Sequence, residues 1–314
     1  MKNFIKNIKN KFRFVKKNPW ILLLWNNLRM RKGKREVEII SDFDAVMNYY
    51  ETYTGHKPNL ENPESFSEKL QWLKLFYRDP LMAKCADKFS VRDYVKKCGY
   101  EMFLNDLYGV FEDVDDMDIN KLPQKFVLKG AHGSAWNIIC RDKAKINWTV
   151  WKLIMKSWLK QNLYWYGREW VYKDIKPRII CEKYLEDESG ELRDYKFFCF
   201  NGVPKCIQVE TGRYSSFNTR NFYDTEWRLL PFGKELPHNP EATIPKPENF
   251  ELMIEKARNL SKPFCFVRVD FYNVLGQIYF GELTFFPAGG APNFVPQEYD
   301  QIVGSWLQLP EKNI

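Results

Sequence analysis

The stretch FVRVDFYNVLGQIYFGELTF, residues 266–285, contains two β-rich runs that meet at residues 273–276. Asp270 and Glu282 lie six residues before and after Gly276, so a hairpin turning there would place both carboxylates on one face of a sheet. Two carboxylates that face each other among apolar residues repel, and the usual compensations are a shared proton or a divalent cation. The pair is therefore a candidate metal site. The alternative is a solvated strand face, which is the commoner setting for such a pair.

A second stretch, FVLKGAHGSAWNII, occupies residues 126–139. Lys129 ends an apolar run, and the small residues Gly130, Gly133 and Ser134 follow it. Small residues allow successive main-chain N–H groups to approach phosphate oxygens, and the lysine adds positive charge. The spacing differs from G-x-x-x-x-G-K-[ST], so a Walker loop is excluded. By itself the stretch fits either a phosphate-binding loop or a glycine-containing hairpin turn.

A third stretch, IICEKYLED (residues 179–187), is typical of an apolar strand that carries Glu182 and Lys183 and returns to apolar Leu185. The edge of such a strand, with one N–H and one C=O available, can bind the edge of an adenine ring, and apolar neighbours can sandwich the ring. The pattern alone does not distinguish this strand from any other buried strand.

The composition indicates a globular protein with a large core. The chain has 314 residues, 45% of them hydrophobic, with 24 Phe, 17 Tyr and 11 Trp, which is enough for one or two domains. Its seven cysteines form no C-x-x-C pair and lie mostly in apolar runs, so we expect buried thiols in a reducing compartment. Only three histidines are present, which leaves little to build a zinc site.

The net charge of +8 comes from the N-terminal tail: residues 1–35 hold twelve Lys and Arg and no acid, whereas the remainder nets −4. Apolar residues recur between the lysines near helical spacing, which is typical of a helix in a membrane interface rather than a nucleic-acid-binding arm. The run PWILLLW (residues 19–25) is too short to span a bilayer, and no signal-peptide cleavage site follows it. We expect a cytoplasmic protein held peripherally on an anionic inner leaflet; a basic helix packed on its own core is the alternative.

The rest of the chain alternates between helical and strand patterns. Ser41 and Ser65 are expected N-caps of two early helices, and Glu68 has the spacing of a capping box with Ser65. We predict an α+β fold with helices early and an antiparallel sheet late. It divides into a basic helical tail, a mostly helical region and a β-rich region that carries the three stretches, at residues 1–35, 36–125 and 126–310.

These three stretches, in this order, resemble the ATP-grasp fold of the D-alanine:D-alanine ligase type. The sequence is more similar still to the TupA-like ATP-grasp family of bacterial surface-polysaccharide gene clusters. The similarity is carried by NPESFSEKLQWLKLFYRDPLMAKCADKFSVRDYV (62–95), YWYGREWVYKDIKPRIICEKYL (164–185), LRDYKFFCFNG (192–202) and GELTF (281–285), and it covers roughly residues 60–310. It does not cover the tail.

The resemblance implies two α+β subdomains that clasp ATP, with Mg²⁺ bridging the phosphates. By position, Asp270 and Glu282 are the implied Mg²⁺ ligands, together with Thr284 where many ATP-grasp enzymes carry Asn. Lys129 is the implied phosphate ligand under the loop, and Arg268 matches the arginine that steadies the developing oxyanion in the ligases.

Other implied contacts divide between nucleotide and substrate. The nucleotide set comprises an early phosphate-contacting lysine, the loop, the adenine-reading strand and a ribose ligand: Lys88, Gly130, Gly133, Ser134, Glu182, Lys183, Leu185 and Asp194. The loop is bulkier than a typical ATP-grasp loop, so His132 and Trp136 are expected to contact substrate. Cations in RDYK (193–196) and TGRYSSFNTRNFYD (211–224) are candidate ligands for substrate carboxylates or phosphates, namely Lys196, Arg213 and Arg220.

The implied activity is that of an ATP-dependent carboxylate–amine ligase that works through an acyl phosphate. The polysaccharide context suggests that an amino acid is joined to a uronic acid of a capsule, O-antigen or teichuronic-type glycan, free or lipid-linked. A glycosyltransferase or sugar kinase of the same pathway is the alternative, although VDDMD (114–118) is a poor sugar-nucleotide metal motif. A non-catalytic scaffold at the membrane is a third reading.

Overall fold

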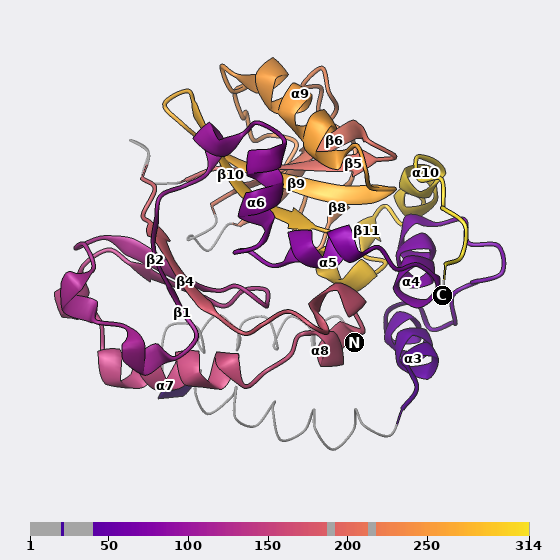
Figure 1. The fold of residues 1–314 in the computed structure, drawn as a ribbon. Helices are drawn as coiled ribbons and strands as arrows, with labels where there is room; N and C mark the ends of the chain where they lie inside the picture. Colours follow the sequence, from indigo (N-terminus) through magenta and orange to yellow (C-terminus); the bar gives the residue numbers. More distant parts are fainter. Residues whose placement is uncertain (1–19, 22–39, 187–191, 213–217, 314) are drawn as a thin grey trace. The chain divides into compact units, whose positions relative to one another are not determined.

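The computed structural model describes residues 20–21, 40–186, 192–212 and 218–313. The chain forms two compact units (Figure 1). Among the described residues, unit 1 contains Asp106–Tyr166 and Tyr172–Tyr184, and unit 2 contains Ser41–Asn105, Gly167–Val171 and residues 185–186, 192–212 and 218–313. The units interleave along the sequence, so their boundaries differ from the predicted regions 36–125 and 126–310. The difference arises because strand β1 (Leu107–Phe111) follows the early helices in the sequence but pairs with β4 (Ile179–Lys183). It therefore belongs to unit 1, whereas those helices belong to unit 2.

Most of the basic tail, residues 1–35, and the helix expected there lie outside the described residues. Within the described ranges, no helix is long and apolar enough to cross a membrane. Five of the seven cysteines are buried, as the sequence predicts, and all seven are free thiols.

Unit 1 is built on a four-stranded antiparallel sheet with the order β1-β4-β2-β3. The predicted strand–turn–strand pattern forms β2 (Phe126–Gly130) and β3 (Asn137–Cys140). The predicted helix that follows is α7 (Trp148–Leu159), which begins at Asn147, whose side chain accepts a hydrogen bond from the N–H of Val150. A short helix, α8 (Tyr164–Gly167), comes after it.

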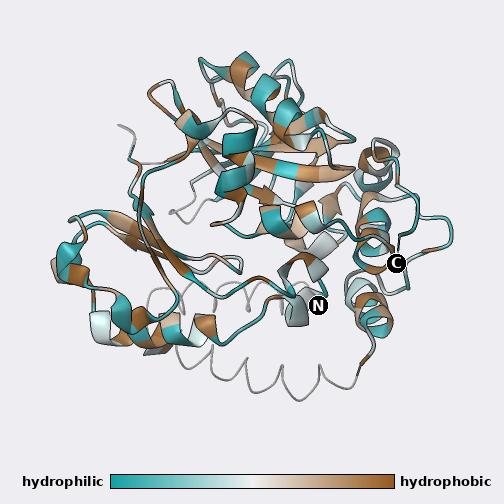
Figure 2. Ribbon diagram, viewed as in Figure 1, coloured by the Kyte–Doolittle hydropathy of each residue, from teal (hydrophilic) through white to brown (hydrophobic). Residues whose placement is uncertain are grey.

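One face of this sheet packs against α7. Leu128 on β2 pairs with Ile138 on β3 and Cys181 on β4, so the three side chains share a face. In α7 the buried residues recur every three or four positions, the period of a helical stripe. Figure 2 shows hydrophobic colour along these strands and a mixture along α7. The resulting core includes Phe126, Leu128, Ile138, Cys140, Val150, Ile154, Trp158, Ile179 and Cys181.

Unit 2 contains a five-stranded antiparallel sheet with the order β10-β9-β5-β6-β7, and a two-stranded sheet, β11-β8. The strands are β5 (Asp194–Phe200), β6 (Val203–Thr211), β7 (Thr219–Tyr223), β8 (Gly233–Lys234), β9 (Phe266–Val274), β10 (Gln277–Thr284) and β11 (Phe294–Val295). The helices are α3 (Asp42–Thr54), α4 (Phe66–Phe76), α5 (Pro80–Ala86), α6 (Val91–Lys97), α9 (Phe250–Ser261) and α10 (Tyr299–Ser305). Short 3₁₀ turns in the two units are η1 (Glu101–Phe103), η2 (Val114–Asp116), η3 (Ile119–Lys121), η4 (Lys143–Lys145), η5 (Trp170–Tyr172) and η6 (Pro287–Gly290).

The predicted helix starts in unit 2 are confirmed. The Ser41 side chain caps α3 by accepting from the N–H of Asp44, and the helix ends at Gly55 with a left-handed φ of 78°. Ser65 and Glu68 form the predicted capping box at the start of α4, because each side chain accepts from the main chain of the other.

Helix α9 covers one face of the five-stranded sheet. Phe250 on α9 contacts Phe197 on β5, with ring centroids 6.1 Å apart, and the Cys199 thiol lies 3.9 Å from the carbonyl oxygen of Ala257. Because side chains alternate along a strand, the neighbouring residues Lys196 and Phe198 point to the opposite face. That opposite face is the one that carries charge.

The first helices of unit 2 join its last one. The main-chain N–H of Ser67 on α4 donates to the Asp300 carboxylate on α10 at 3.0 Å, and the Ser67 hydroxyl donates to the same carboxylate. Lys69 reaches the end of α10, where its Nζ donates to the carbonyl oxygens of Gly304 and Leu307 at 2.9 and 2.7 Å. The unit is therefore closed by contacts between its two ends.

Candidate active site

A bulge in the β9–β10 hairpin places the two predicted metal ligands opposite each other. Val274 pairs with Gln277, so Leu275 and Gly276 form a two-residue turn, and both have positive φ, as a type I′ turn requires. Continued from that turn, a regular register would pair Asp270 with Gly281 and turn Glu282 to the other face. The register shifts between Phe280 and Glu282 instead, and Glu282 pairs with Asp270.

The prediction that both carboxylates share a face is therefore confirmed, but its reasoning from symmetry about Gly276 is wrong. Gly281 makes the arrangement possible, since a Cβ atom at this position would lie 2.9 Å from the main-chain oxygen of Asp270. A glycine inside a strand pattern is a signal for a bulge, and it was available in the sequence.

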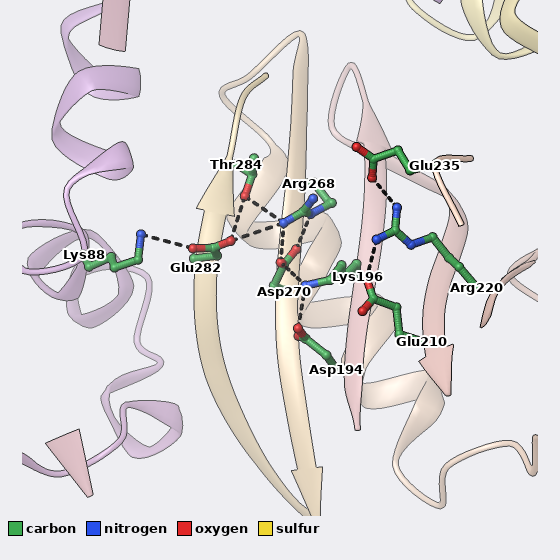
Figure 3. A network of polar contacts seen from close by, with 10 residues as sticks. All are labelled: Lys88, Asp194, Lys196, Glu210, Arg220, Glu235, Arg268, Asp270, Glu282 and Thr284. Atoms are coloured by element: carbon green, nitrogen blue, oxygen red, sulfur yellow. Dashed lines mark hydrogen bonds and ion pairs between the residues drawn. The ribbon is translucent and has the colours of Figure 1, made fainter. Parts of the chain in front are cut away.

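Arg268 joins the predicted metal ligands into one cluster (Figure 3). Its Nε donates to Oδ1 of Asp270 at 2.7 Å, and its Nη2 donates to Oδ2 of the same carboxylate at 2.6 Å. The same Nη2 donates to Oε1 of Glu282 at 3.2 Å and to Oγ1 of Thr284 at 3.0 Å. The Thr284 hydroxyl donates in turn to Oε1 of Glu282 at 3.2 Å.

Two lysines complete the compensation of the acids. Lys196 lies opposite Asp270 on the neighbouring strand, and its Nζ donates to Oδ2 of Asp270 at 2.8 Å and to Oδ2 of Asp194 at 2.5 Å. Lys88, between α5 and α6, places its Nζ 3.3 Å from Oε2 of Glu282. Lys196, expected to bind substrate, and Asp194, expected to bind ribose, are thus buried in the same network as the acids.

The opposite charges in this network stabilise one another's ionised forms. Burial acts to raise the pKa of Glu282, but Lys88, Arg268 and Lys196 outweigh it and hold that pKa well below its usual range. Burial raises the pKa of Asp270, and Arg268 and Lys196 oppose the rise. Burial lowers the pKa of Lys196, but Asp194 and Asp270 together raise it above its ordinary value. The cluster is therefore an array of alternating charges rather than a pair of bare acids.

The donor chemistry of the cluster fits Mg²⁺ only in part. Asp270, Glu282 and Thr284 offer oxygen atoms, the ligands that Mg²⁺ takes. Within the described residues, no group of three or more His, Cys, Asp or Glu side chains is placed to hold a metal ion by itself. Mg²⁺ commonly binds through one or two carboxylates and completes its shell with phosphates and water. These residues therefore suit an ion that arrives with a nucleotide.

A second ion network lies on the same face of the sheet, around Arg220 (Figure 3). Arg220 on β7 lies opposite Glu210 on β6, and its Nη2 is 2.5 Å from Oε1 of that glutamate. Its Nη1 donates to the Glu235 carboxylate and to the carbonyl oxygen of Lys234, the latter at 3.1 Å. Arg220, expected to bind substrate, is therefore buried between two carboxylates of its own unit. Arg213, the other arginine expected there, lies outside the described residues.

In unit 1, Lys129 and Glu182 form an ion pair on the sheet face opposite α7. Val127 pairs with Glu182 and Lys129 pairs with Ile180, which places all four side chains on that face. The Nζ of Lys129 lies 2.7 Å from Oε2 of Glu182. Ile139 pairs with Val127 and is exposed on the same face. The face thus combines one partly buried ion pair with apolar side chains.

The remaining predicted residues of the adenine strand separate at its end. Lys183 is exposed and pairs with Asp106, with 3.2 Å between Nζ and Oδ2. Leu185 is buried and belongs to unit 2, because unit 1 ends at Tyr184. The structure brings Glu182 to Lys129 but does not bring Lys183 to them.

The glycine loop is shaped by Trp136. A Cβ atom on Gly133 would lie 2.3 Å from the indole ring of Trp136, and one on Gly130 would lie 3.0 Å from it. Both glycines therefore have a packing role, and Ser134, the next residue in the loop, is exposed. Trp136 itself stacks on Trp158 with 6.3 Å between ring centroids.

The expectation that His132 contacts substrate is not supported by its position. The ring is 2% exposed. Its Nε2 is 3.0 Å from the carbonyl oxygen of Trp158, and its Nδ1 accepts from the N–H of Arg178 at 3.3 Å. Since a carbonyl can only accept, Nε2 carries the proton and the ring is the neutral tautomer. His132 ties the loop to the end of α7 and the start of β4.

Comparisons with known proteins agree with this architecture. The family model described as TupA-like ATPgrasp matches residues 68–308. No curated protein matches the chain.

Among solved structures, D-alanine–D-alanine ligase from Bacillus anthracis, complexed with ATP, is 17% identical; the match covers 64% of this chain and 53% of that chain, with a TM-score of 0.37. D-alanine–D-alanine ligase from Helicobacter pylori is 11% identical over 80% of this chain and 68% of that chain, with a TM-score of 0.43. The ATP-grasp ligase PsnB, complexed with a variant of its minimal precursor, Mg and ADP, is 10% identical over 76% and 66%, with a TM-score of 0.40.

The chain thus spans about half the length of the first of these ligases. Two of the three structures hold ATP or ADP, and one of them holds Mg. The family model spans most of the chain, including the Lys129–Glu182 pair and the whole Arg268 cluster. The chain therefore belongs to the TupA-like ATP-grasp family, and its fold is the ATP-grasp fold.

Proposed function

We propose that the protein is an ATP-dependent carboxylate–amine ligase. In the first step a carboxylate oxygen of the acceptor attacks the γ-phosphorus of ATP and ADP leaves, which gives an acyl phosphate. In the second step an amine attacks the acyl carbon, phosphate leaves, and the nitrogen loses a proton as the amide forms. The observation that carries the proposal is the cluster in which Arg268 bonds to Asp270, Glu282 and Thr284 at once.

The residues of this cluster divide the work by charge. Asp270, Glu282 and Thr284 would hold Mg²⁺, which supplies positive charge to the transferring phosphoryl group when bound. Arg268 contributes a permanent cation at the same place, because Asp270 and Glu282 keep its pKa above the ordinary value although burial opposes this. A fixed guanidinium can stabilise the oxyanion that develops during acyl transfer. The chemistry needs no nucleophilic Ser or Cys.

The face of the unit 1 sheet opposite α7 supports nucleotide binding. Its half-buried Val127 and exposed Ile139 suit contact with an adenine ring. Lys129 suits the phosphates because an ammonium group makes charge-assisted bonds to phosphate oxygens. In its present position Lys129 is paired with Glu182, so nucleotide binding would redistribute that pair.

We further propose that the acceptor is a uronic acid of a surface glycan, free or lipid-linked, and that the donor of the amine is an amino acid. The support is the family's association with surface-polysaccharide gene clusters and the basic tail. The twelve cations of residues 1–35 suit an anionic membrane surface, where a lipid-linked glycan would be found. Peripheral membrane attachment through the tail is part of the same proposal.

The acids of VDDMD, the one sequence candidate of the glycosyltransferase alternative, are exposed on short surface turns. In the VDDMD segment, Val114 and Met117 are buried, and Asp115 forms an ion pair with Lys156 at 2.6 Å. The Asp113 side chain caps the short turn η2 by accepting from the N–H of Asp115. These acids hold the turn in place. A sugar kinase would use the same nucleotide contacts and remains the second candidate.

An isotope experiment separates these functions. Purified protein would be incubated with ATP, Mg²⁺, an amino-acid panel and uronic acids labelled with ¹⁸O in the carboxylate. A ligase transfers one ¹⁸O from the carboxylate to the released phosphate. It also yields an amide of the uronic acid and the amino acid, with ADP formed in equal amount. A sugar kinase forms ADP without free phosphate, and a glycosyltransferase forms no ADP from ATP. Either of the last two results would overturn the ligase.

A further inference from the structure

The loop that follows β10 has a left-handed turn at its centre. Thr284, a proposed metal ligand, ends β10, and the turn Pro287–Gly290 begins three residues later. Ala288, Gly289 and Gly290 have φ values of 55°, 62° and 70° in succession. Glycine adopts this region readily, but Ala288 carries a Cβ atom and adopts it at a cost in free energy that contacts with its surroundings must offset.

Three side chains from α3 and α4 hold the carbonyl groups of this turn. The Tyr49 hydroxyl donates to the oxygen of Ala288 at 2.9 Å. Lys74 Nζ donates to the oxygen of Gly289 at 2.7 Å, and Gln71 Nε2 donates to the oxygen of Gly290 at 2.9 Å. Each of the three left-handed residues thus has its carbonyl oriented by a separate side chain.

A second lysine holds the end of the same loop. Lys234 on β8 donates from Nζ to the carbonyl oxygen of Ala291 at 2.6 Å and to Oδ1 of Asn293 at 2.6 Å. Lys74 and Lys234 are only 1% and 2% exposed. The loop therefore has one buried ammonium group at its turn and another at its end.

Neither ammonium has a carboxylate within ion-pair distance among the described residues. The aromatic rings of Tyr49 and Phe286 lie 5.0 and 5.9 Å from Lys74 Nζ, and that of Phe294 lies 4.5 Å from Lys234 Nζ. Burying an ammonium group without an ion pair is costly, and methionine would fill a similar volume without that cost. Packing alone does not account for two such charges on one loop.

We propose that Lys74 and Lys234 are positioning residues for the reaction. They fix the loop of residues 286–293, and through it the end of β10 that carries Thr284 and Glu282. This inference rests on the proposed function, since it assumes that those two side chains serve the chemistry. It assigns no contact with substrate to either lysine.

The ionisation of the two lysines supplies a readout. Burial lowers the pKa of Lys74 and of Lys234 from 10.5 to about 8, with Glu169 opposing at Lys74 and Glu235 and Asp300 opposing at Lys234. Glu169, in the segment Gly167–Val171, has its own pKa raised by burial to about 7. The charged or titratable groups that face the lysines are Tyr49 on α3, Glu169, Arg220 on β7, Glu235 and Asp300 on α10. Arg78 on α4 donates to the main-chain oxygen of Lys74.

Activity and stability should respond to pH in opposite directions. As pH rises through about 8, the folded protein loses these two charges, so an activity that needs them falls. The same lysines in the unfolded chain keep their protons up to about 10.4. Between these values the unfolded state binds more protons, so the contribution of the two lysines to stability increases with pH. A role in stability alone would not produce an alkaline loss of activity.

The test compares Lys74→Met and Lys234→Met with Lys69→Met. Lys69 lies on the same helix as Lys74 and also donates to two carbonyl oxygens, but those belong to Gly304 on α10 and to Leu307, two residues after that helix. For each protein we would measure hydrogen exchange of a peptide covering residues 285–295, kcat for ATP turnover from pH 6 to 10, and the melting temperature.

In Lys74→Met and Lys234→Met we expect faster exchange in the loop and a kcat lower by about tenfold to a hundredfold, the effect of slightly misplaced groups. We also expect kcat to decrease less steeply at alkaline pH, and the melting temperature at pH 7 to be unchanged or higher. Lys69→Met should have the same hydrogen exchange in the loop, the same kcat and the same decrease of kcat at alkaline pH as the natural protein. Wild-type kcat and pH profile in both loop variants would overturn the inference.

Measurements on the natural protein distinguish a failure of the proposed function from a failure of the positioning role. If it shows neither Mg·ATP binding by calorimetry nor ATP turnover, the ligase proposal fails whatever the variants do. The exchange measurement still decides whether the lysines fix the loop, since exchange unchanged in both Met variants overturns that part directly.

Discussion

Glu282 lies directly opposite Asp270 on the neighbouring strand, and one extra residue in β10 produces this pairing. Without the shift in register, the two carboxylates would face opposite sides of the sheet, and Arg268 could not bond to both. The bulge therefore determines whether the cluster exists.

The acids are tested by Asp270→Asn and Glu282→Gln. Each should reduce Mg²⁺-dependent ATP turnover by more than about a hundredfold, because a bound metal ion contributes several kcal/mol to phosphoryl transfer. Turnover is measured as ADP release, and circular dichroism checks the fold. Glu226→Gln is the matched control, since Glu226 is exposed and pairs only with Arg228 at 2.9 Å among the ion pairs of the described chain. Full activity in both acid variants would refute the metal assignment.

The bulge is tested by Gly281→Ala. The added Cβ atom would lie 2.9 Å from the main-chain oxygen of Asp270, so the strands must shift. We expect a loss of about 1–3 kcal/mol in the free energy of unfolding, as for other overpacked positions. ATP turnover should fall as far as in Glu282→Gln, because the pairing of the acids is disturbed. Chemical denaturation and ADP release measure the two effects, and a variant as active as the natural protein would show that the close contact is dispensable.

The nucleotide face is tested by Lys129→Met. Loss of a charge-assisted contact to phosphate should weaken ATP binding by about 1–3 kcal/mol. Isothermal titration measures the affinity. Lys145→Met removes an equal charge from the same unit, at an exposed lysine that pairs with Asp142 at 3.4 Å, and should leave affinity unchanged. Equal affinities for the Lys129 variant and the natural protein would mean that the loop is only a structural turn.

The tail is tested by deleting residues 1–35. Each Lys or Arg near an anionic leaflet contributes about 1 kcal/mol, so a few engaged cations suffice for reversible attachment. The natural chain should co-sediment with anionic vesicles, less so at high salt because salt screens the attraction. The truncated chain should stay in the supernatant. Equal sedimentation of both proteins would argue for a structural helix.

Local patterns in the sequence predict most of the elements of this fold. The capping box of Ser65 and Glu68 and the period-two runs of β2 and β9 are readable because each depends on residues close in the chain. The family resemblance adds the set of charged residues. The structure confirms the local elements, and the family match confirms the family.

Long-range partners could not be read in the same way. Lys196 pairs with Asp270 across 74 residues, and Arg220 is held by Glu235, which follows a separate strand. A cation on a strand looks the same in sequence whether it faces a substrate or a buried acid. The interleaving of the two units is equally hidden, because nothing in the local pattern shows that β1 pairs with β4.

The hydrogen bonds from Ser67 to Asp300 join residues 233 positions apart. During synthesis, α4 is complete long before α10 leaves the ribosome, so its apolar face must wait for most of the chain to be translated. Contacts this distant in sequence slow folding and prolong the exposure of sticky surface. The closure of unit 2 at its two ends therefore delays the completion of this packing until almost the whole unit has been translated.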